Sequence, residues 1–351
     1  MKIQEIQTES RKLTAETNIT TDICIIGAGP VGLFAVFEAG LLKMRCHLID
    51  ALPQVGGQLS EIYPHKPIYD IPGYPSVNAQ ELVDKLMEQI QPFNPSFTLG
   101  ERVESLEKQA DDSYLVIGNE GTVIHAEVVV IAGGLGSFEP RKPEIPRLAD
   151  FEGFGVSYMV KNPEHYRDKR VVIAGGGDSA LDWTVFLSDV AREVTLVHRS
   201  DSFRGAPDSA EKVFNLAEKG KVKLLLHSNL SSVHGNGRLS HVGIAGKDKK
   251  ETLLETDALI PLFGLSPKLG PIADWGLQIE KSAIAVNTVD YATGVERIYA
   301  IGDINTYPGK LKLILCGFHE AALMAQSAFR YVHPAEKLSF KYTTVNGVNS
   351  F

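Results

Sequence analysis

The chain of 351 residues is long enough to form two domains, each with a buried core. Its apolar fraction of 44% and charged fraction of 22% are ordinary for a soluble globular protein, and its net charge of −8 argues against general nucleic-acid binding. Three cysteines without close spacing predict neither a disulfide framework nor a metal site, and they fit a reducing cytoplasm.

The first predicted element is a β-branched strand at residues 21–26, of the kind that is buried on both faces of a parallel sheet. A glycine-rich turn follows, then a helix to about residue 42 and a second strand at 45–49. The apolar run around this turn, residues 23–37, is shorter than the roughly 20 residues that cross a membrane. Farther along, we expect a helix at 79–90 and strands near 97–108, 113–118 and 122–131.

Glycine and proline breaks at 133–146 predict a crossover into a second domain, in which the same order of elements returns. There we expect strands at 170–174, 193–197, 222–227, 239–245 and 258–263, and a helix at 178–191. A strand at 297–301 and a helix at 313–331 complete the first sheet. The predicted fold is therefore α/β, with two Rossmann-like three-layer domains, the second inserted in the first. The expected boundaries are 1–150 and 293–332 for the first domain, 151–292 for the second, and 333–351 for a tail.

Two glycine-rich turns occupy equivalent places in the two domains, each between a predicted strand and a predicted helix. The first contains Gly27, Gly29, Pro30 and Gly32, and the second contains Gly175, Gly177, Asp178 and Ser179. Glycines let the backbone turn sharply and approach a pyrophosphate, and the helix that follows offers unpaired N–H groups and partial positive charge. Two copies in this context predict two dinucleotide sites.

The residues that end each second strand distinguish the two nucleotides. Asp50 ends the first, and a carboxylate there accepts hydrogen bonds from a ribose 2′-hydroxyl, which suits FAD. His198 and Arg199 end the second, with Arg204 close by, and arginine binds a 2′-phosphate through forked hydrogen bonds, which suits NADPH. A solvated surface loop is the alternative interpretation of the arginines.

Other candidate cofactor contacts are Gln58, which follows two glycines, and Gly302-Asp303 at the end of the last strand. Tyr63 could stack on a flavin ring, although a packed loop aromatic is an equally ordinary role. No Cys-x-x-Cys occurs, so no redox-active dithiol can relay electrons to a disulfide. No catalytic residue is assigned, because no nucleophile–base constellation is evident.

With these motifs, the chain resembles the ferredoxin–NADP⁺ reductases of the thioredoxin-reductase-like type over nearly its whole length. The segments that carry this resemblance are the two glycine turns, residues 53–59, residues 63–70 and residues 301–304. By resemblance, FAD contacts fall on Asp50, Gln58, Tyr63, Val103, Phe138, Asp303 and Thr344. Tyr63 would stack on one face of the flavin, and Tyr342 from the tail of the partner subunit would cover the other.

The resemblance implies a cytoplasmic homodimer that passes a hydride from NADPH to flavin N5 and then two single electrons to an acidic ferredoxin. It implies no metal, nucleic acid or membrane. Two alternatives stay open: an NADPH-dependent reductase of flavodoxin or another small acceptor, and a non-catalytic flavoprotein that responds to NADPH.

Overall fold

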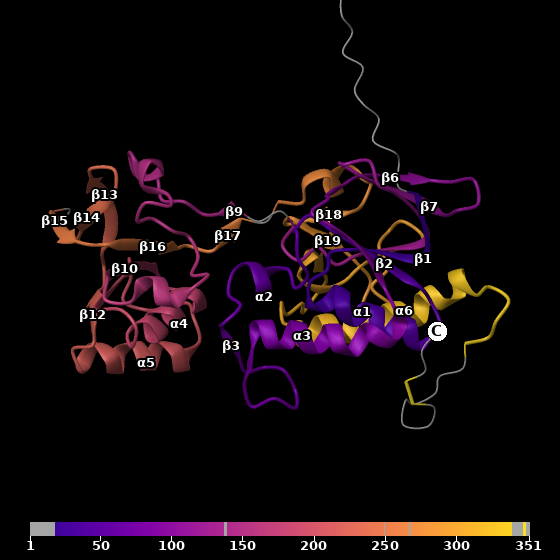
Figure 1. The fold of residues 1–351 in the computed structure, drawn as a ribbon, viewed down its shortest axis with the longest axis horizontal. Coiled ribbons are helices and arrows are strands. Elements are labelled where there is room, and N and C mark those ends of the chain that lie inside the picture. The colour runs from indigo at the N-terminus through magenta and orange to yellow at the C-terminus, as the bar shows by residue number, and fades with distance from the viewer. Residues whose placement is uncertain (1–17, 137–138, 249, 267, 339–346, 349–351) are drawn as a thin grey trace, which may run out of the picture. The chain divides into compact units, whose positions relative to one another are not determined.

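The structure is a computed structural model that describes residues 18–136, 139–248, 250–266, 268–338 and 347–348. Contacts within the chain divide it into two compact units. The first takes in the ranges 1–60, 67–136 and 269–351, and the second takes in 61–66 and 137–268. Each unit has a sheet with a parallel core and helices of its own (Figure 1).

The first unit is built on a seven-stranded sheet of order β5-β2-β1-β8-β7-β6, with β20 also paired to β8. Strands β5, β2, β1, β8 and β20 are parallel, whereas β8, β7 and β6 form an antiparallel meander. The bounds are β1 (Asn18–Ile26), β2 (Cys46–Asp50), β5 (Ser96–Leu99), β6 (Val103–Lys108), β7 (Tyr114–Gly118), β8 (Val123–Ile131) and β20 (Ile298–Ala300). The central strand β1 ends in the buried run 23–26, as its β-branched sequence predicts.

Three long helices cover one face of this sheet, and α1 contacts the other two (Figure 1). The helices of the first unit are α1 (Pro30–Leu41), α3 (Ala79–Ile90) and α6 (Ile314–Val332), and the short α2 (Gln58–Glu61) ends at its border. Helix α3 buries Leu82, Leu86 and Ile90, whose spacing places them on one side of a helix. Helix α1 begins at a proline directly after the glycine turn, a position that proline favours.

The other face of the sheet is covered by the segment that follows residue 269. Ile272, Leu277 and Ile284 from that segment are buried in one cluster with β-strand residues such as Val116 and Val129. Short strands complete the unit: β3 (Pro67–Ile68), β4 (Val77–Asn78), β18 (Ile279–Glu280), β19 (Ala283–Ala285) and β21 (Asn305–Thr306).

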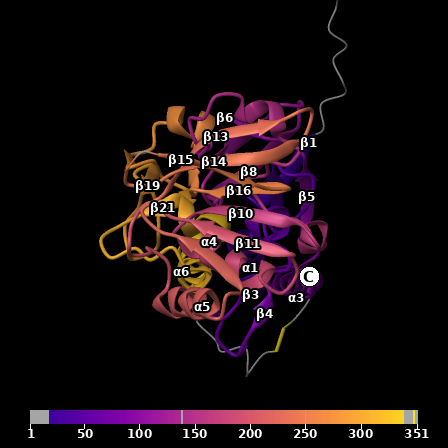
Figure 2. The same ribbon diagram turned by 90° about the vertical axis from the view of Figure 1, so that its left-hand side faces the viewer.

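The second unit repeats the parallel core with the order β12-β11-β10-β16. Helices α4 and α5 pack on one face, and a three-stranded antiparallel sheet, β13-β14-β15, covers the other (Figure 2). The bounds are β10 (Arg170–Gly175), α4 (Asp178–Leu187), β11 (Glu193–Val197), α5 (Pro207–Glu218), β12 (Val222–Leu225), β13 (Asn229–Gly235), β14 (Leu239–Ala245), β15 (Glu251–Glu255) and β16 (Ala258–Leu262). A two-stranded pair, β9 (Glu139–Pro140) with β17 (Leu265–Ser266), belongs to the same unit.

The fold class expected from the sequence is confirmed, but three details differ. Residues 97–108 form two strands at opposite ends of the sheet path, β5 and β6, because Gly100 turns the chain at φ +79°. Helix α4 ends at Leu187 rather than at 191. The contact boundaries fall near 137 and 268 instead of 150 and 292, because the segment after 269 buries its apolar residues in the first unit.

Candidate functional site

The first glycine turn is shaped by close contacts that only glycine permits. Gly27 has a φ of +114°, and a Cβ there would lie 2.5 Å from the carbonyl oxygen of Ala132 on the neighbouring strand. A Cβ at Gly32 would lie 2.1 Å from the carbonyl oxygen of Gly27, so the helix packs directly on the turn. At Gly29, by contrast, a Cβ would meet no described atom within 4 Å. The turn therefore leaves open space at the amino terminus of α1, where a pyrophosphate would approach.

Asp50 is bound directly to this turn. Its Oδ2 accepts a hydrogen bond of 2.7 Å from the N–H of Ala28, and its Oδ1 accepts one of 2.8 Å from Leu52. Burial raises the pKa of the Asp50 carboxyl, although the two N–H donors act to lower it. The carboxylate thus bonds to the turn. It lies at the end of β2, the position from which the sequence predicts a contact with a ribose.

A second loop lies against the same turn. The N–H of Gly56 donates to the carbonyl of Ala28 at 2.8 Å, and a Cβ at Gly57 would lie 3.2 Å from the Cα of Gly29. Gln58 follows, and its Nε2 would be 3.5 Å from a Cβ at Gly134, which stands just beyond β8. Gln58 is therefore brought to the carboxyl end of the strands beside the glycine turn.

Gly302 and Asp303 reach the same place from the other end of the chain. Gly302 has a φ of +78°, and its Cβ position lies 3.4 Å from Val31 in the first turn of α1. Asp303 follows in a short 3₁₀ turn, and burial raises the pKa of its carboxyl. Val103 is a buried residue of the core cluster, so its side chain packs within the sheet.

The carboxylate of Glu320 holds this corner, and the sequence analysis did not identify it. Glu320 is 0% exposed, and its two oxygens accept hydrogen bonds from the N–H of Gly302, Nδ2 of Asn305, Oη of Tyr307 and Nζ of Lys310. Four donors, one of them a buried cation, offset the cost of burying the charge. A sequence signal existed, because Glu320 interrupts the buried apolar stripe of α6 formed by Gly317, Ala321 and Met324.

Tyr63 lies in the second unit. It packs against the core cluster that includes Val160 and Leu181, and the ammonium of Lys66 lies 5.6 Å from the centre of its ring. Phe138, Tyr342 and Thr344 lie outside the described residues.

The second glycine turn repeats the geometry of the first. Gly175 has a φ of +157°, and its Cβ position lies 2.6 Å from the carbonyl oxygen of Leu262. Gly177 is the N-cap of α4, and a Cβ there would meet no described atom within 4 Å. Asp178 and Ser179 begin the helix and are exposed.

Three of the residues expected around a 2′-phosphate differ in their surroundings. Arg199 and Arg204 are exposed, and neither forms an ion pair with any described residue. His198 is only 6% exposed; its ring lies against Gly176, where a Cβ would be 2.1 Å away, and it contacts the tilted ring of Phe203 at 4.9 Å between centroids. The position of His198 supports a packing role, and the two arginines remain the candidates for phosphate contact.

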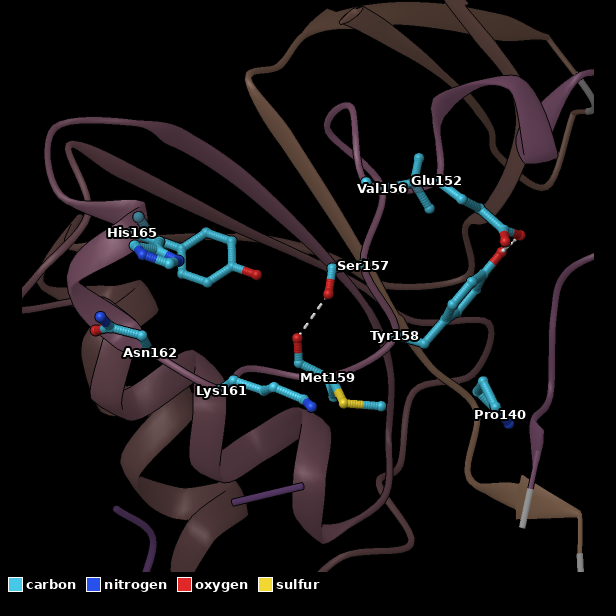
Figure 3. Close-up of a pocket in the computed structure, with 11 residues that line it drawn as sticks. Pro140, Glu152, Val156, Ser157, Tyr158, Met159, Lys161, Asn162 and His165 are labelled. Carbon is cyan, nitrogen blue, oxygen red and sulfur yellow. Dashed lines mark hydrogen bonds between the residues drawn. The ribbon is translucent and has the colours of Figure 1, made fainter. Parts of the chain in front are cut away.

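A hollow of about 450 Å³ lies in the second unit, lined by Pro140 and by ten residues of the segment between Glu152 and Tyr166 (Figure 3). None of the sequence-predicted site residues lines it. Several of its polar groups are already hydrogen-bonded: Tyr158 donates to Glu152 and Ser157 to the carbonyl of Met159, while Lys161 donates to Glu61, which does not line the hollow. We assign no ligand to it.

Metal and thiol chemistry find no support in the described parts of the chain. Among those residues, no group of three or more His, Cys, Asp or Glu side chains could hold a metal ion. Burial raises the pKa of the thiols of Cys24 and Cys46, which keeps both protonated. No helix among the described residues is long and apolar enough to cross a membrane.

Two glycine turns at the carboxyl ends of two parallel sheets define a class of protein that binds two dinucleotides in one chain. The family described as pyridine nucleotide-disulphide oxidoreductase matches residues 21–326. The chain belongs to this family.

Curated relatives match almost the full length. "Ferredoxin--NADP reductase 1" of Christiangramia forsetii is 64% identical over 336 residues, covering 95% of each chain. "Ferredoxin--NADP reductase" of Flavobacterium johnsoniae is 62% identical with the same coverage. The thioredoxin reductase of Lactococcus lactis superposes with a TM-score of 0.77 at 24% identity, covering 89% of this chain and 99% of that one, and it supports the fold alone. The resemblance that the motifs indicated is confirmed.

Proposed function

We propose that the protein is an FAD-dependent oxidoreductase that transfers electrons between NADP(H) and ferredoxin. The observation that carries this proposal is the pair of glycine turns with opposite second-strand endings, Asp50 in one unit and Arg199 in the other. The names of relatives that are 62–64% identical over 95% of the chain support ferredoxin as the partner.

The residues of the first unit fit FAD. The space at Gly29 accepts a pyrophosphate, Asp50 accepts from a ribose hydroxyl, and Gln58 and Asp303 stand at the same edge of the sheet for the ribityl chain and ring. When bound, FAD supplies the change from hydride transfer to one-electron transfer. The chain's own groups position and shield it, and no side chain is required as a nucleophile or base.

The residues of the second unit fit NADPH. Gly177 leaves open space at the amino terminus of α4 for the pyrophosphate, and Arg199 and Arg204, which form no ion pair with the residues that the structure describes, offer guanidinium groups for the 2′-phosphate. This chain has no Cys-x-x-Cys, so it lacks the dithiol through which a thioredoxin reductase would pass electrons onward.

The decisive experiment is a comparison of acceptors. Purified protein reconstituted with FAD is mixed with NADPH and one of four acceptors: ferredoxin, flavodoxin, thioredoxin or oxygen. Ferredoxin should give the fastest turnover. Faster turnover with flavodoxin would make the protein a reductase of that carrier, and no turnover with any acceptor would favour a non-catalytic flavoprotein that responds to NADPH.

We also propose a cytoplasmic homodimer in which Tyr342 of one subunit covers the flavin of its partner. The free cysteines, two of them buried, suit a reducing compartment. Ending the chain at Lys341 should speed the reaction of the reduced flavin with oxygen or a small dye about threefold or more, because the cover that excludes water is lost.

The tail prediction is checked by stopped-flow oxidation of the reduced enzyme, with Tyr342→Phe as the control that keeps the ring. That control should behave as the parent does. Equal oxidation rates in the shortened and full-length proteins would remove the tail from the flavin site.

A further inference from the structure

The loop that carries the two arginines is bonded to the second glycine turn through its backbone. The N–H of Arg204 donates to the carbonyl of Gly176 at 2.7 Å, and the N–H of Gly205 donates to the same oxygen at 3.2 Å. Gly205 fits so closely that a Cβ would lie 2.9 Å from the amide nitrogen of Asp178. The expected 2′-phosphate site and the expected pyrophosphate site are therefore parts of one bonded structure.

The Asp178 side chain also bonds to this loop. Its Oδ1 accepts a hydrogen bond of 2.7 Å from the N–H of Ala206, the N-cap of α5. The bond joins the first residue of α4 to the residue that precedes α5. From beneath, the ring of His198 contacts Gly176, and its Nε2 lies 3.0 Å from the carbonyl oxygen of Ser202.

We infer that Asp178 is a positioning residue that sets the preference for NADPH over NADH, by holding the Arg199–Arg204 loop in register with the glycine turn. This inference rests on the proposed use of NADPH. Arginine side chains are long and flexible, so the affinity of the pair for a phosphate depends on where the backbone presents them. A loop fixed to the pyrophosphate turn presents them at the distance that one nucleotide spans.

A purely electrostatic effect of Asp178 would change nucleotide binding in the opposite direction, so the experiment can distinguish the two. Removing a carboxylate beside two phosphate sites should strengthen the binding of any anion, because a like charge is lost. If Asp178 acts through the loop instead, its loss should weaken the binding of the 2′-phosphate and spare the rest of the nucleotide.

The experiment compares 2′,5′-ADP with ADP by isothermal titration of the FAD-loaded protein. Asp178→Ala should weaken the binding of 2′,5′-ADP about fivefold relative to ADP, which is less than the loss of one direct hydrogen bond to a charged group, because Asp178 acts on the phosphate only through the loop. Asp178→Asn keeps an acceptor oxygen and should bind 2′,5′-ADP as tightly as the parent protein or more so. In Asp178→Ala, the KM for NADPH should likewise rise relative to the KM for NADH.

A second variant removes the donor instead of the acceptor. Ala206 has a φ of −54°, which proline can adopt, so Ala206→Pro deletes the N–H, and the proline Cδ that replaces the hydrogen also displaces the Asp178 carboxylate. Ala206→Pro should weaken the binding of 2′,5′-ADP as much as Asp178→Ala does. The double variant should bind 2′,5′-ADP no more weakly than either single variant. Ser209→Ala is the control, because it removes only the next bond between α4 and α5, which Ser209 donates to Asp182.

Each outcome separates the inference from the function on which it rests. Equal loss of 2′,5′-ADP and ADP binding, or tighter binding of both by Asp178→Ala, would overturn the role of Asp178. Additive effects of Asp178→Ala and Ala206→Pro would do the same. A parent protein that binds 2′,5′-ADP no better than ADP would instead contradict the NADPH assignment itself.

Discussion

Replacement of both Arg199 and Arg204 by alanine is expected to raise the KM for NADPH roughly 100-fold, because hydrogen bonds between charged groups contribute about 1.5–3 kcal/mol each. The KM for NADH should stay within about twofold of the parent value, since NADH has no 2′-phosphate for the arginines to bind. Both side chains are exposed and lack described ion-pair partners, so their removal leaves no buried charge behind.

The measurement is steady-state turnover with each nucleotide at saturating acceptor. Arg238→Ala serves as the control, because Arg238 is an exposed arginine of the same unit that lies between β13 and β14, away from the glycine turn. A similar rise in KM for NADH and NADPH would show that the arginines do not recognise the 2′-phosphate.

Asp50→Ala is expected to weaken FAD binding roughly 100-fold, because it removes a half-buried charged acceptor that serves both the protein and the cofactor. Without the carboxylate, the N–H groups of Ala28 and Leu52 lose their partners, and the turn that receives the pyrophosphate loses its support. Asp50→Asn keeps one acceptor oxygen, and its FAD affinity should lie between those of the parent protein and Asp50→Ala.

FAD retention is measured by titrating flavin into the apoprotein and following fluorescence quenching. Asp22→Ala is the matched control: Asp22 also accepts a backbone N–H, from Arg45, but this contact lies at the other end of the β1–β2 pairing from the turn. It should lower stability slightly and leave FAD affinity unchanged. A yellow, fully active Asp50→Ala protein would contradict the role of Asp50.

Local sequence predicted much of this arrangement. The strand–turn–helix order around Gly27 and Gly175 follows from β-branched runs, glycine punctuation and helix-forming segments, all of which act over short distances. The contrast between Asp50 and Arg199 could likewise be seen in the chain, because the end of the second strand stands at a nearly constant spacing from the turn.

Contacts between distant segments could not be predicted in this way. Residues 269–285 complete the core of the first unit although they follow the second unit in the chain, and Tyr63 packs in the second unit although it follows the first glycine turn. Such placements depend on which apolar faces meet, and one sequence does not specify the partner of an apolar face.

The amino-acid order was sufficient to predict two nucleotide sites and a different nucleotide for each, because that information lies in short segments whose backbone geometry is local. Folding in three dimensions was needed to show how each site is held: Glu320 bonds the Gly302 corner, and Asp178 bonds the arginine loop. Hydrogen-bond partners far apart in the chain become neighbours only after the sheets and helices have packed, so no local sequence pattern predicts them.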